Sequence, residues 1–191
     1  MTCNVLVDNS IRSLYKWVKS EEYYGWDPYD ALNSNLVSKL CSNSQLSEIL
    51  ITQLNKYSIL NIRPILGIEK GLDIKGISLF AQSYSKIYSL TNDQQYKDDL
   101  FECINFLKNK SLKQKYGFDC WAGHYFNYRG FDGSTLAPDI PDVITTSNVI
   151  KAIADSYLIF KDDELKNIAK SAYDFLIKHL LGKTDEGLYY L

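Results

Sequence analysis

The sequence predicts an all-α fold built from tandem antiparallel helical hairpins of the solenoid or toroid type. Three observations support this prediction. Apolar residues recur at i, i+3 and i+4 in successive segments, the spacing that places them on one face of a helix. Short polar turns join these segments in pairs, so each pair is expected to form an antiparallel hairpin. No segment shows the alternating apolar and polar pattern of a half-buried strand.

The first part of the chain is expected to hold a short helix and then a hairpin. Asp8 is a candidate N-cap for the short helix. The hairpin is expected to begin at Pro28, because proline suits the first turn of a helix and Asp27 and Asp30 suit its N-cap and N3 positions. A break at 42–44 then leads to its second helix. The apolar faces predicted for the three helices are Ile11, Leu14, Tyr15 and Val18; Leu32, Leu36, Val37 and Leu40; and Leu46, Ile49, Leu50, Leu54 and Tyr57.

Two further hairpins are expected over 73–107 and 143–181. In the first hairpin, Asn92 or Asp93 is expected to begin the second helix. In the second hairpin, Asp162 or Asp163 is expected to do the same. The two pairs share short stretches of similar sequence in the same order, which favours a structural repeat over chance similarity. Gly182 follows the last apolar position and is expected to end the final helix.

The long connection over 111–142 is expected to carry function, because long loops inside compact domains are uncommon and often functional. The chain closes on an apolar stretch, 189–191, as if another helix were about to begin. A finished solenoid ends in a polar cap. We therefore expect one α-hairpin domain over 1–191 that is a truncated or split portion of a longer repeat protein.

Composition excludes several classes of function. The chain has 191 residues with 21 basic and 23 acidic side chains, a net charge of −2, which argues against a nucleic-acid binder. No apolar stretch is long enough to span a bilayer. Residues 1–13 lack the basic leader and cleavage site of a secretory signal, so a cytoplasmic location is expected. The four cysteines are widely spaced, which predicts unpaired thiols, and neither a metal nor another cofactor is expected.

The aromatic segment over 116–132 is the richest candidate site. Aromatic rings stack on the C–H faces of sugars, and polar residues at the rim bind hydroxyls. The alternative is a plug that buries these rings over the helical array. His124 is a candidate acid or base because its ordinary pKa lies near neutrality, and a plain hydrogen-bonding role is the alternative. The other candidates here are Trp121, Tyr125, Asn127 and Arg129.

A second group of candidates lies over 23–34. Asp27 and Asp30 are carboxylates that could transfer protons, and a helix cap explains them equally well. Trp26 and Tyr29 are candidate stacking residues or simple packing residues, and Asn33 is a candidate ligand for hydroxyls. A third stretch, 141–147, is expected to cap the following helix.

Three motifs occur in order along the chain: Trp-Asp-Pro-Tyr-Asp-Ala-Leu-Asn-Ser at 26–34, Cys-Trp at 120–121 and Pro-Asp-Val-Ile-Thr-Thr-Ser at 141–147. Together they resemble a family of helical proteins encoded in bacterial and archaeal capsule, exopolysaccharide and lipopolysaccharide loci. The resemblance implies a six-hairpin glycosidase-like (α/α) toroid, of which this chain would form a partial toroid, about the N-terminal half. It also implies a second polypeptide that completes the toroid. Asn127 stands where the family pattern has Asp, which removes one candidate acid or base.

Three hypotheses about function follow from the motifs and the resemblance. The first is a carbohydrate-related protein of surface-polysaccharide biosynthesis, with a poly- or oligosaccharide as partner, and if it is an enzyme, a hydrolase, lyase or epimerase. The second is a non-catalytic carbohydrate-binding or scaffolding module. The third is a terpenoid cyclase-like toroid, but Asp162 and Asp163 lack the further acidic residues of that motif.

Overall fold

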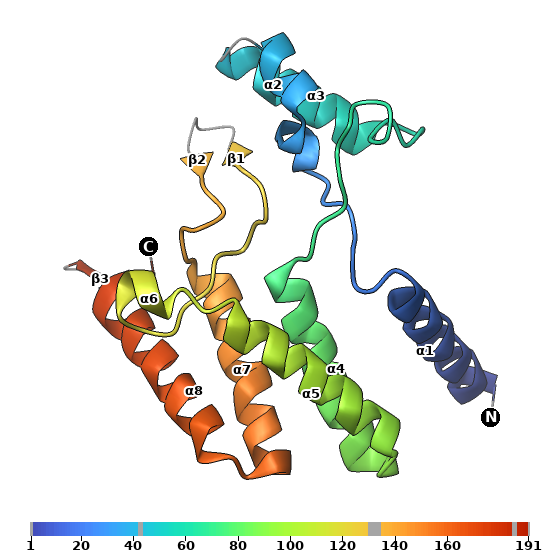
Figure 1. Ribbon diagram of the computed structural model, residues 1–191, viewed down its shortest axis with the longest axis vertical. Helices are drawn as coiled ribbons and strands as arrows, with labels where there is room; N and C mark the ends of the chain where they lie inside the picture. Colours follow the sequence, from blue (N-terminus) through green and yellow to red (C-terminus); the bar gives the residue numbers. More distant parts are fainter. Residues whose placement is uncertain (1, 42–43, 130–134, 185–186, 191) are drawn as a thin grey trace. The chain divides into compact units, whose positions relative to one another are not determined.

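A computed structural model of the chain describes residues 2–41, 44–129, 135–184 and 187–190 (Figure 1). The described residues form two compact units. Unit 1 extends to Leu72, and unit 2 begins at Asp73. Helices predominate in both units, which confirms the all-α class and the helical hairpins. The single domain over 1–191 and the toroid stay predictions.

Helix α1 (Thr2–Ser20) opens unit 1. Asp8 lies inside this helix, so the prediction that it caps a shorter helix is wrong. The helix ends in a tight turn in which Glu22 and Tyr23 adopt positive φ angles of 50° and 64°. Of the expected apolar face, Val18 is buried and Tyr15 half-buried, whereas Ile11 and Leu14 are exposed. The apolar side chains of α1 that are more than two-fifths exposed are Val7, Ile11, Leu14 and Trp17.

The helix predicted from Pro28 is divided in two. A 3₁₀ helix, η1 (Asp30–Asn33), precedes α2 (Asn35–Cys41). Ser34 lies between them, and its Oγ accepts hydrogen bonds from the N–H groups of Leu36 and Val37, both at 3.2 Å. The same hydroxyl donates to the Leu66 carbonyl. Because this side chain satisfies the first N–H groups of α2, a new helix begins at Ser34 and the preceding one stops.

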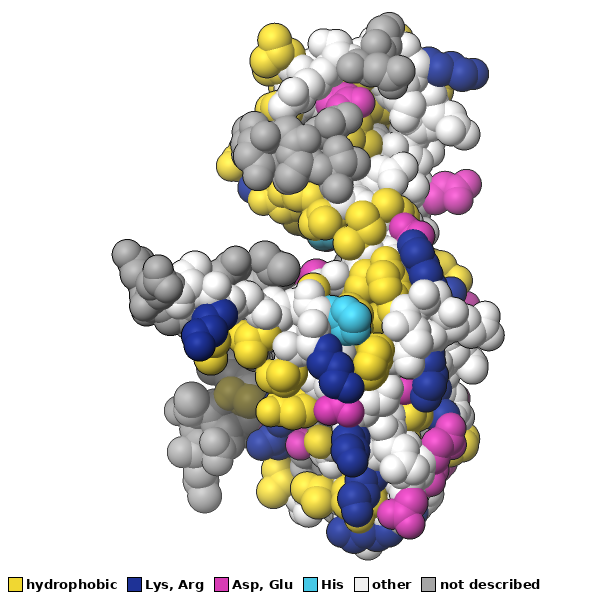
Figure 2. All heavy atoms as spheres, turned by 90° about the vertical axis from the view of Figure 1, so that its left-hand side faces the viewer, with side chains coloured by type: hydrophobic (Ala, Val, Ile, Leu, Met, Phe, Trp, Pro, Cys, Tyr) yellow, Lys and Arg dark blue, Asp and Glu magenta, His cyan; other side chains and the backbone are white. Residues whose placement is uncertain are grey.

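Helix α3 (Gln45–Tyr57) turns its polar face inward. The side chains of Thr52 and Asn55 are buried, and Asn55 donates 2.9 Å to Asp30 Oδ1. The predicted apolar face is exposed instead: Leu46, Leu50, Leu54 and Tyr57 are all more than 60% exposed. Hydrophobic side chains accordingly reach the surface of the part that contains α2 and α3 (Figure 2). The expectation that these residues form a core is therefore wrong for unit 1.

Unit 2 contains the two predicted hairpins. Helix α4 (Ile74–Thr91) pairs with α5 (Gln94–Asn109), and α7 (Val143–Phe160) pairs with α8 (Asp163–Phe175). Helices α4 and α7 pack against each other, which joins the two hairpins (Figure 1). Each of the four helices begins at an aspartate whose carboxylate accepts a backbone N–H bond. These N-caps are Asp73, Asp93, Asp142 and Asp162.

The core of unit 2 comes from the predicted apolar faces. Leu100 and Leu107 of α5 and Val149 and Ile153 of α7 are completely buried. The two hairpins share similar stretches of sequence at 81–84 and 154–157, but these do not occupy equivalent environments. Ala81 is buried, whereas Ala154, at the matching position of the second hairpin, is exposed. The shared order of helix, turn and helix is therefore the part of the repeat that the structure retains.

The remaining elements are short. Helix α6 (Lys113–Tyr116) opens the connection after α5, and strands β1 (Tyr128–Arg129) and β2 (Thr135–Leu136) pair antiparallel within it. After α8 a π-helical turn, η2 (Leu176–Leu180), leads into strands β3 (Leu181–Thr184) and β4 (Gly187–Tyr190). The expected start of another helix at the chain end is therefore wrong. Strands of two to four residues are too short to show an alternating pattern, which explains why sequence reading found none.

Candidate functional site

The candidate residues fall into two groups, one in each unit. Trp26, Asp27, Tyr29, Asp30 and Asn33 belong to unit 1, and Trp121, His124, Tyr125, Asn127 and Arg129 belong to unit 2. Each group is described within its own unit.

Asp27 and Asp30 accept hydrogen bonds from backbone N–H groups in the turn that leads into η1, whose N-cap position is Tyr29 and not Asp27. The Asp27 N–H donates to Asp30 Oδ2 over 3.1 Å, and the Tyr29 N–H donates to Asp27 Oδ1 over 2.8 Å. Both carboxylates are thus bonded to backbone N–H groups of one tight turn. This geometry favours the cap interpretation over a pair of carboxylates facing each other across a sugar.

Asp30 is completely buried in a polar cluster. The Arg63 Nε donates to both of its oxygens, at 3.0 and 3.2 Å, and Asn55 Nδ2 donates over 2.9 Å. Arg63 also donates to the Asp27 carbonyl over 3.1 Å. Burial raises the pKa of Asp30, while the bonds from Arg63 and Asn55 lower it. A carboxylate enclosed in this way holds η1 to the rest of unit 1.

Trp26 and Tyr29 each lie beside a lysine. The Trp26 indole N–H donates to the Ile68 carbonyl over 3.2 Å, and Lys70 Nζ lies 4.8 Å from the ring centre. Lys56 Nζ donates to the Tyr29 hydroxyl over 2.6 Å, a bond that raises the pKa of Lys56. The same Lys56 Nζ lies 4.5 Å from the centre of the Tyr29 ring, so each ring carries a cation–π contact. Asn33 is half-buried on η1.

Trp121 anchors the aromatic segment to the core of unit 2. It has no exposed surface, and its indole N–H donates to the Leu107 carbonyl over 2.7 Å. Its backbone N–H and C=O both bond to the Thr146 hydroxyl at 3.2 Å. Trp121 thus joins α5 to α7 and offers no ring face to a sugar. For this residue the plug interpretation holds, because burial and the α5 carbonyl fix the ring inside.

The neighbouring Cys120 and Asp119 are also buried. Cys120 packs against Phe175 and Leu176, and burial raises the pKa of its thiol to about 12. Asp119 accepts hydrogen bonds from Lys113 Nζ at 2.9 Å and from Ser111 Oγ at 2.8 Å. These contacts fix the start of the aromatic segment.

The segment then crosses the first turn of α7. Ala122 forms an isolated bridge with Pro141. A Cβ atom on Gly123 would lie 2.7 Å from Asp142 Oδ2 and 2.8 Å from Thr145 Oγ1. Any larger residue there would displace the Asp142 or Thr145 side chain, since the chain passes directly over the start of α7.

The aromatic side chains of His124, Tyr125, Phe126 and Tyr128 contact one another, and we call these four residues the ring cluster. The His124 and Tyr128 rings lie 4.9 Å apart at an interplanar angle of 13°, and Phe126 lies 5.2 Å from His124. Phe126 is buried, whereas His124, Tyr125 and Tyr128 are partly exposed and Asn127 is exposed. The His124 Nδ1 is buried and has no hydrogen-bond partner among the residues that the structure describes.

The remaining predictions concern Arg129, a metal site and a membrane-spanning segment. The side chain of Arg129 lies outside the described part of the chain. Across 2–41, 44–129, 135–184 and 187–190, no three His, Cys, Asp or Glu side chains converge in a way that could hold a metal ion. No helix among those ranges is both long and apolar enough to traverse a bilayer.

Sequence reading missed the partners of the candidate residues. Arg63, Asn55 and Lys56 hold the first group, and Tyr128 completes the second. The three partners in unit 1 are 25 to 33 residues away from the residues they bind, so no local spacing signals them. Tyr128 lies inside the aromatic segment, and its spacing of four from His124 is the signal that was available.

Comparison with known proteins assigns no family. No family model matches the chain, and no curated protein matches it. The fold is similar to a solved structure described as a GH76A α-1,6-mannanase from Salegentibacter sp. HEL1_6, with a TM-score of 0.45 and 15% identity. The similarity covers 87% of this chain and 49% of the mannanase chain, so this chain spans about half the length of that protein. A likeness at this level supports no conclusion about function.

Proposed function

We propose that the chain binds a poly- or oligosaccharide through the ring cluster. The observation that carries this proposal is the stack of His124 on Tyr128, which leaves partly exposed rings beside the exposed amide of Asn127. Aromatic rings offer an apolar face to sugar C–H groups, and an exposed amide can both donate to and accept from hydroxyls. Tyr125 lies at the edge of the same cluster and adds a third partly exposed ring.

Binding without catalysis is the form of this proposal that the contacts favour. Asp27 and Asp30 are engaged with backbone N–H groups of the turn that leads into η1, and Asp30 is enclosed by Arg63 and Asn55. Proton transfer requires a group that reaches the substrate. In this proposal the two aspartates are structural, and the saccharide contacts come from unit 2.

Catalysis by His124 is the second candidate function, and one observation favours it. Nδ1 of His124 is buried without a partner among the described atoms, while the ring is held in place by Phe126 and Tyr128. An imidazole held in this position could transfer a proton to or from a saccharide bound on the ring cluster. The reaction would be hydrolysis, elimination or epimerisation of a sugar chain.

The wider setting of the proposal rests on the resemblance of 26–34, 120–121 and 141–147 to proteins of surface-polysaccharide loci. In this setting the chain acts on a capsule, exopolysaccharide or lipopolysaccharide intermediate. A second polypeptide would complete the toroid. These points are expectations from sequence resemblance, and they determine which saccharides are used in the titration.

Calorimetric titration of the full chain with a panel of capsular, exopolysaccharide and lipopolysaccharide oligosaccharides tests the binding proposal. We expect at least one saccharide to bind, and Tyr128→Ala to weaken it about tenfold because a stacking ring is lost. Tyr57→Ala is the matched control, since Tyr57 is an exposed ring in unit 1. Circular dichroism checks that both variants remain folded.

Two outcomes contradict the proposal: no saccharide in the panel binds, or Tyr128→Ala binds as tightly as the wild type. A reducing-end assay with the saccharide that binds separates the two candidate functions. Product formation that His124→Gln abolishes while binding remains would establish catalysis. Binding without product formation would support a non-catalytic carbohydrate-binding module.

A further inference from the structure

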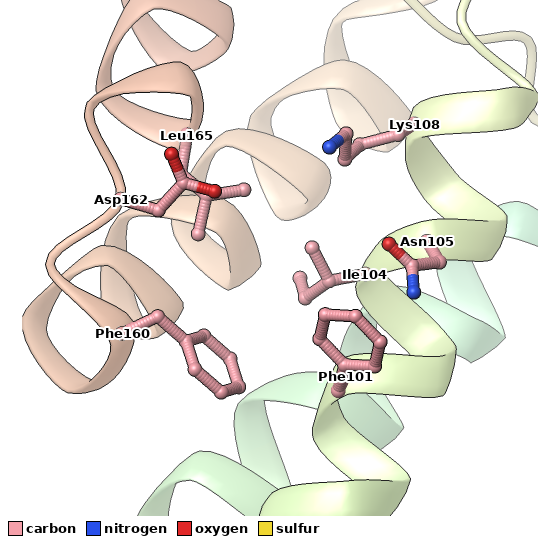
Figure 3. A pocket seen from close by; sticks show the side chains of 7 residues that line it. All are labelled: Phe101, Ile104, Asn105, Lys108, Phe160, Asp162 and Leu165. Carbon is pink, nitrogen blue, oxygen red and sulfur yellow. The ribbon is translucent and has the colours of Figure 1, made fainter.

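A second feature of unit 2 is a pocket between α5 and the turn that joins α7 to α8. Its volume is about 260 Å³. The lining side chains, which share no member with the ring cluster, are Phe101, Ile104, Asn105, Lys108, Phe160, Asp162 and Leu165. Figure 3 shows them arranged around one open space, with residues of α5 on one side and Phe160, Asp162 and Leu165 on the other.

The floor and one wall of the pocket are apolar. Ile104 and Leu165 are each 3% exposed and belong to the core below. The rings of Phe101 and Phe160 meet edge to face with centres 6.1 Å apart. Phe101 is 56% exposed, so a large part of this ring is open to solvent at the pocket. A ligand with an apolar face could cover it.

The rest of the rim is polar. Asn105, Lys108 and Asp162 direct their polar ends toward the open space (Figure 3). Asp162 uses Oδ1 to accept the Glu164 N–H, and Lys108 donates to Glu164 Oε2 over 2.6 Å. This ion pair bridges α5 and α8 beside the pocket. The rim therefore offers amide and ammonium donors together with amide and carboxylate acceptors.

The charges around the pocket argue against an ionic ligand. Lys108 and Glu164 neutralise each other as an ion pair. Of the remaining charges, Asp162 disfavours an anion, and Lys97, whose Nζ lies 5.9 Å from the centre of the Phe160 ring, disfavours a cation. Like charges in close proximity disfavour binding. A neutral ligand avoids both conflicts.

From these features we infer that the pocket binds a single neutral sugar ring, one hexopyranose unit. Such a ring has an apolar C–H face for Phe101 and hydroxyls for Asn105, Lys108 and Asp162. The volume is below the range of about 300–1,000 Å³ found for drug-sized ligands, which suits one ring rather than a chain. This site adds to the proposed saccharide binding at the ring cluster, and it stands on separate residues.

Amide chemical-shift mapping of the full chain tests this site. The probes are methyl glucopyranoside, methyl galactopyranoside and methyl mannopyranoside, with choline and inorganic phosphate as the charged comparators. We expect one of the methyl glycosides to cause saturable shifts over 101–108 and 160–165, with a dissociation constant of about 1–10 mM. Phe101→Ala should weaken this binding about tenfold, because the open ring is lost.

Tyr173→Ala is the matched control, since Tyr173 is an α8 ring that is 58% exposed and does not line the pocket. It should leave the shifts unchanged. The site is refuted if no methyl glycoside causes shifts at about 100 mM, if Phe101→Ala binds as well as the wild type, or if choline or phosphate binds there more tightly. Tyr128→Ala should leave these shifts unchanged, so the proposal for the pocket is tested independently of the proposal for the ring cluster.

Discussion

At the scale of single residues, the sequence predicted roles that depend on near neighbours. Asp27 and Asp30 are three positions apart, and their interpretation as a cap needed only that spacing. The enclosure of Asp30 by Arg63 and Asn55 could not be predicted, because those contacts form between distant parts of the chain. For the same reason Trp121 was a candidate for stacking on sugar until its bond to the Leu107 carbonyl placed it in the core.

Cys120 provides a prediction at this scale. Its side chain is fully buried, and its pKa is raised to about 12, so the reactive thiolate is scarce at pH values near 8. We expect iodoacetamide to leave Cys120 unmodified in the folded protein and to alkylate it in denaturant, as read by peptide mass mapping. Equal rates of alkylation in the two conditions would show that the thiol is accessible and contradict the burial.

At the scale of elements, helical periodicity located the helices better than it located their buried faces. The hairpins of unit 2 match prediction because capping aspartates and apolar stripes agree there. In unit 1, α3 buries Thr52 and Asn55 and exposes its leucines. An apolar stripe in the sequence indicates that one face of the helix is hydrophobic, but whether another element covers that face depends on tertiary contacts. Similarly, the sequence shows a continuous helical pattern through Ser34, but its hydroxyl caps α2 and divides that segment into two helices.

The inverted face of α3 makes a direct prediction about stability. Leu50 is 64% exposed, so Leu50→Ala should change the free energy of unfolding by no more than about 0.5 kcal/mol. Leu107 is completely buried, and Leu107→Ala should lower the free energy of unfolding by about 2–5 kcal/mol. Urea unfolding measures both. A loss of about 2 kcal/mol or more in Leu50→Ala would mean that the leucine face is covered.

The break before α2 makes a second prediction at this scale. Ser34→Ala removes the hydroxyl that accepts from two N–H groups, and should lower the free energy of unfolding by about 1–2 kcal/mol. Ser38→Ala in the same region is the control, because Ser38 is exposed on α2. The capping role would be contradicted by equal unfolding midpoints for the two variants.

At the scale of the whole molecule, the fold class was predictable and the candidate site was predictable in part. Recurring apolar stripes and short turns specify helical hairpins whatever the neighbours are. The aromatic segment was identified by composition alone, and the structure separates its buried members, Trp121 and Phe126, from the partly exposed His124, Tyr125 and Tyr128. That separation depends on tertiary contacts, such as the bonds of Trp121 to Leu107 and Thr146, which no spacing in the sequence specifies.

Hydrogen–deuterium exchange of the full chain, with and without a saturating saccharide from the titration panel, tests the central proposal most directly. Saccharide binding at the ring cluster should slow amide exchange over His124–Tyr128, because bound ligand restricts local opening. Exchange across α1, which carries none of the proposed contacts, should stay the same. Unchanged exchange over His124–Tyr128 under saturating conditions would contradict the proposal that this cluster is the saccharide site.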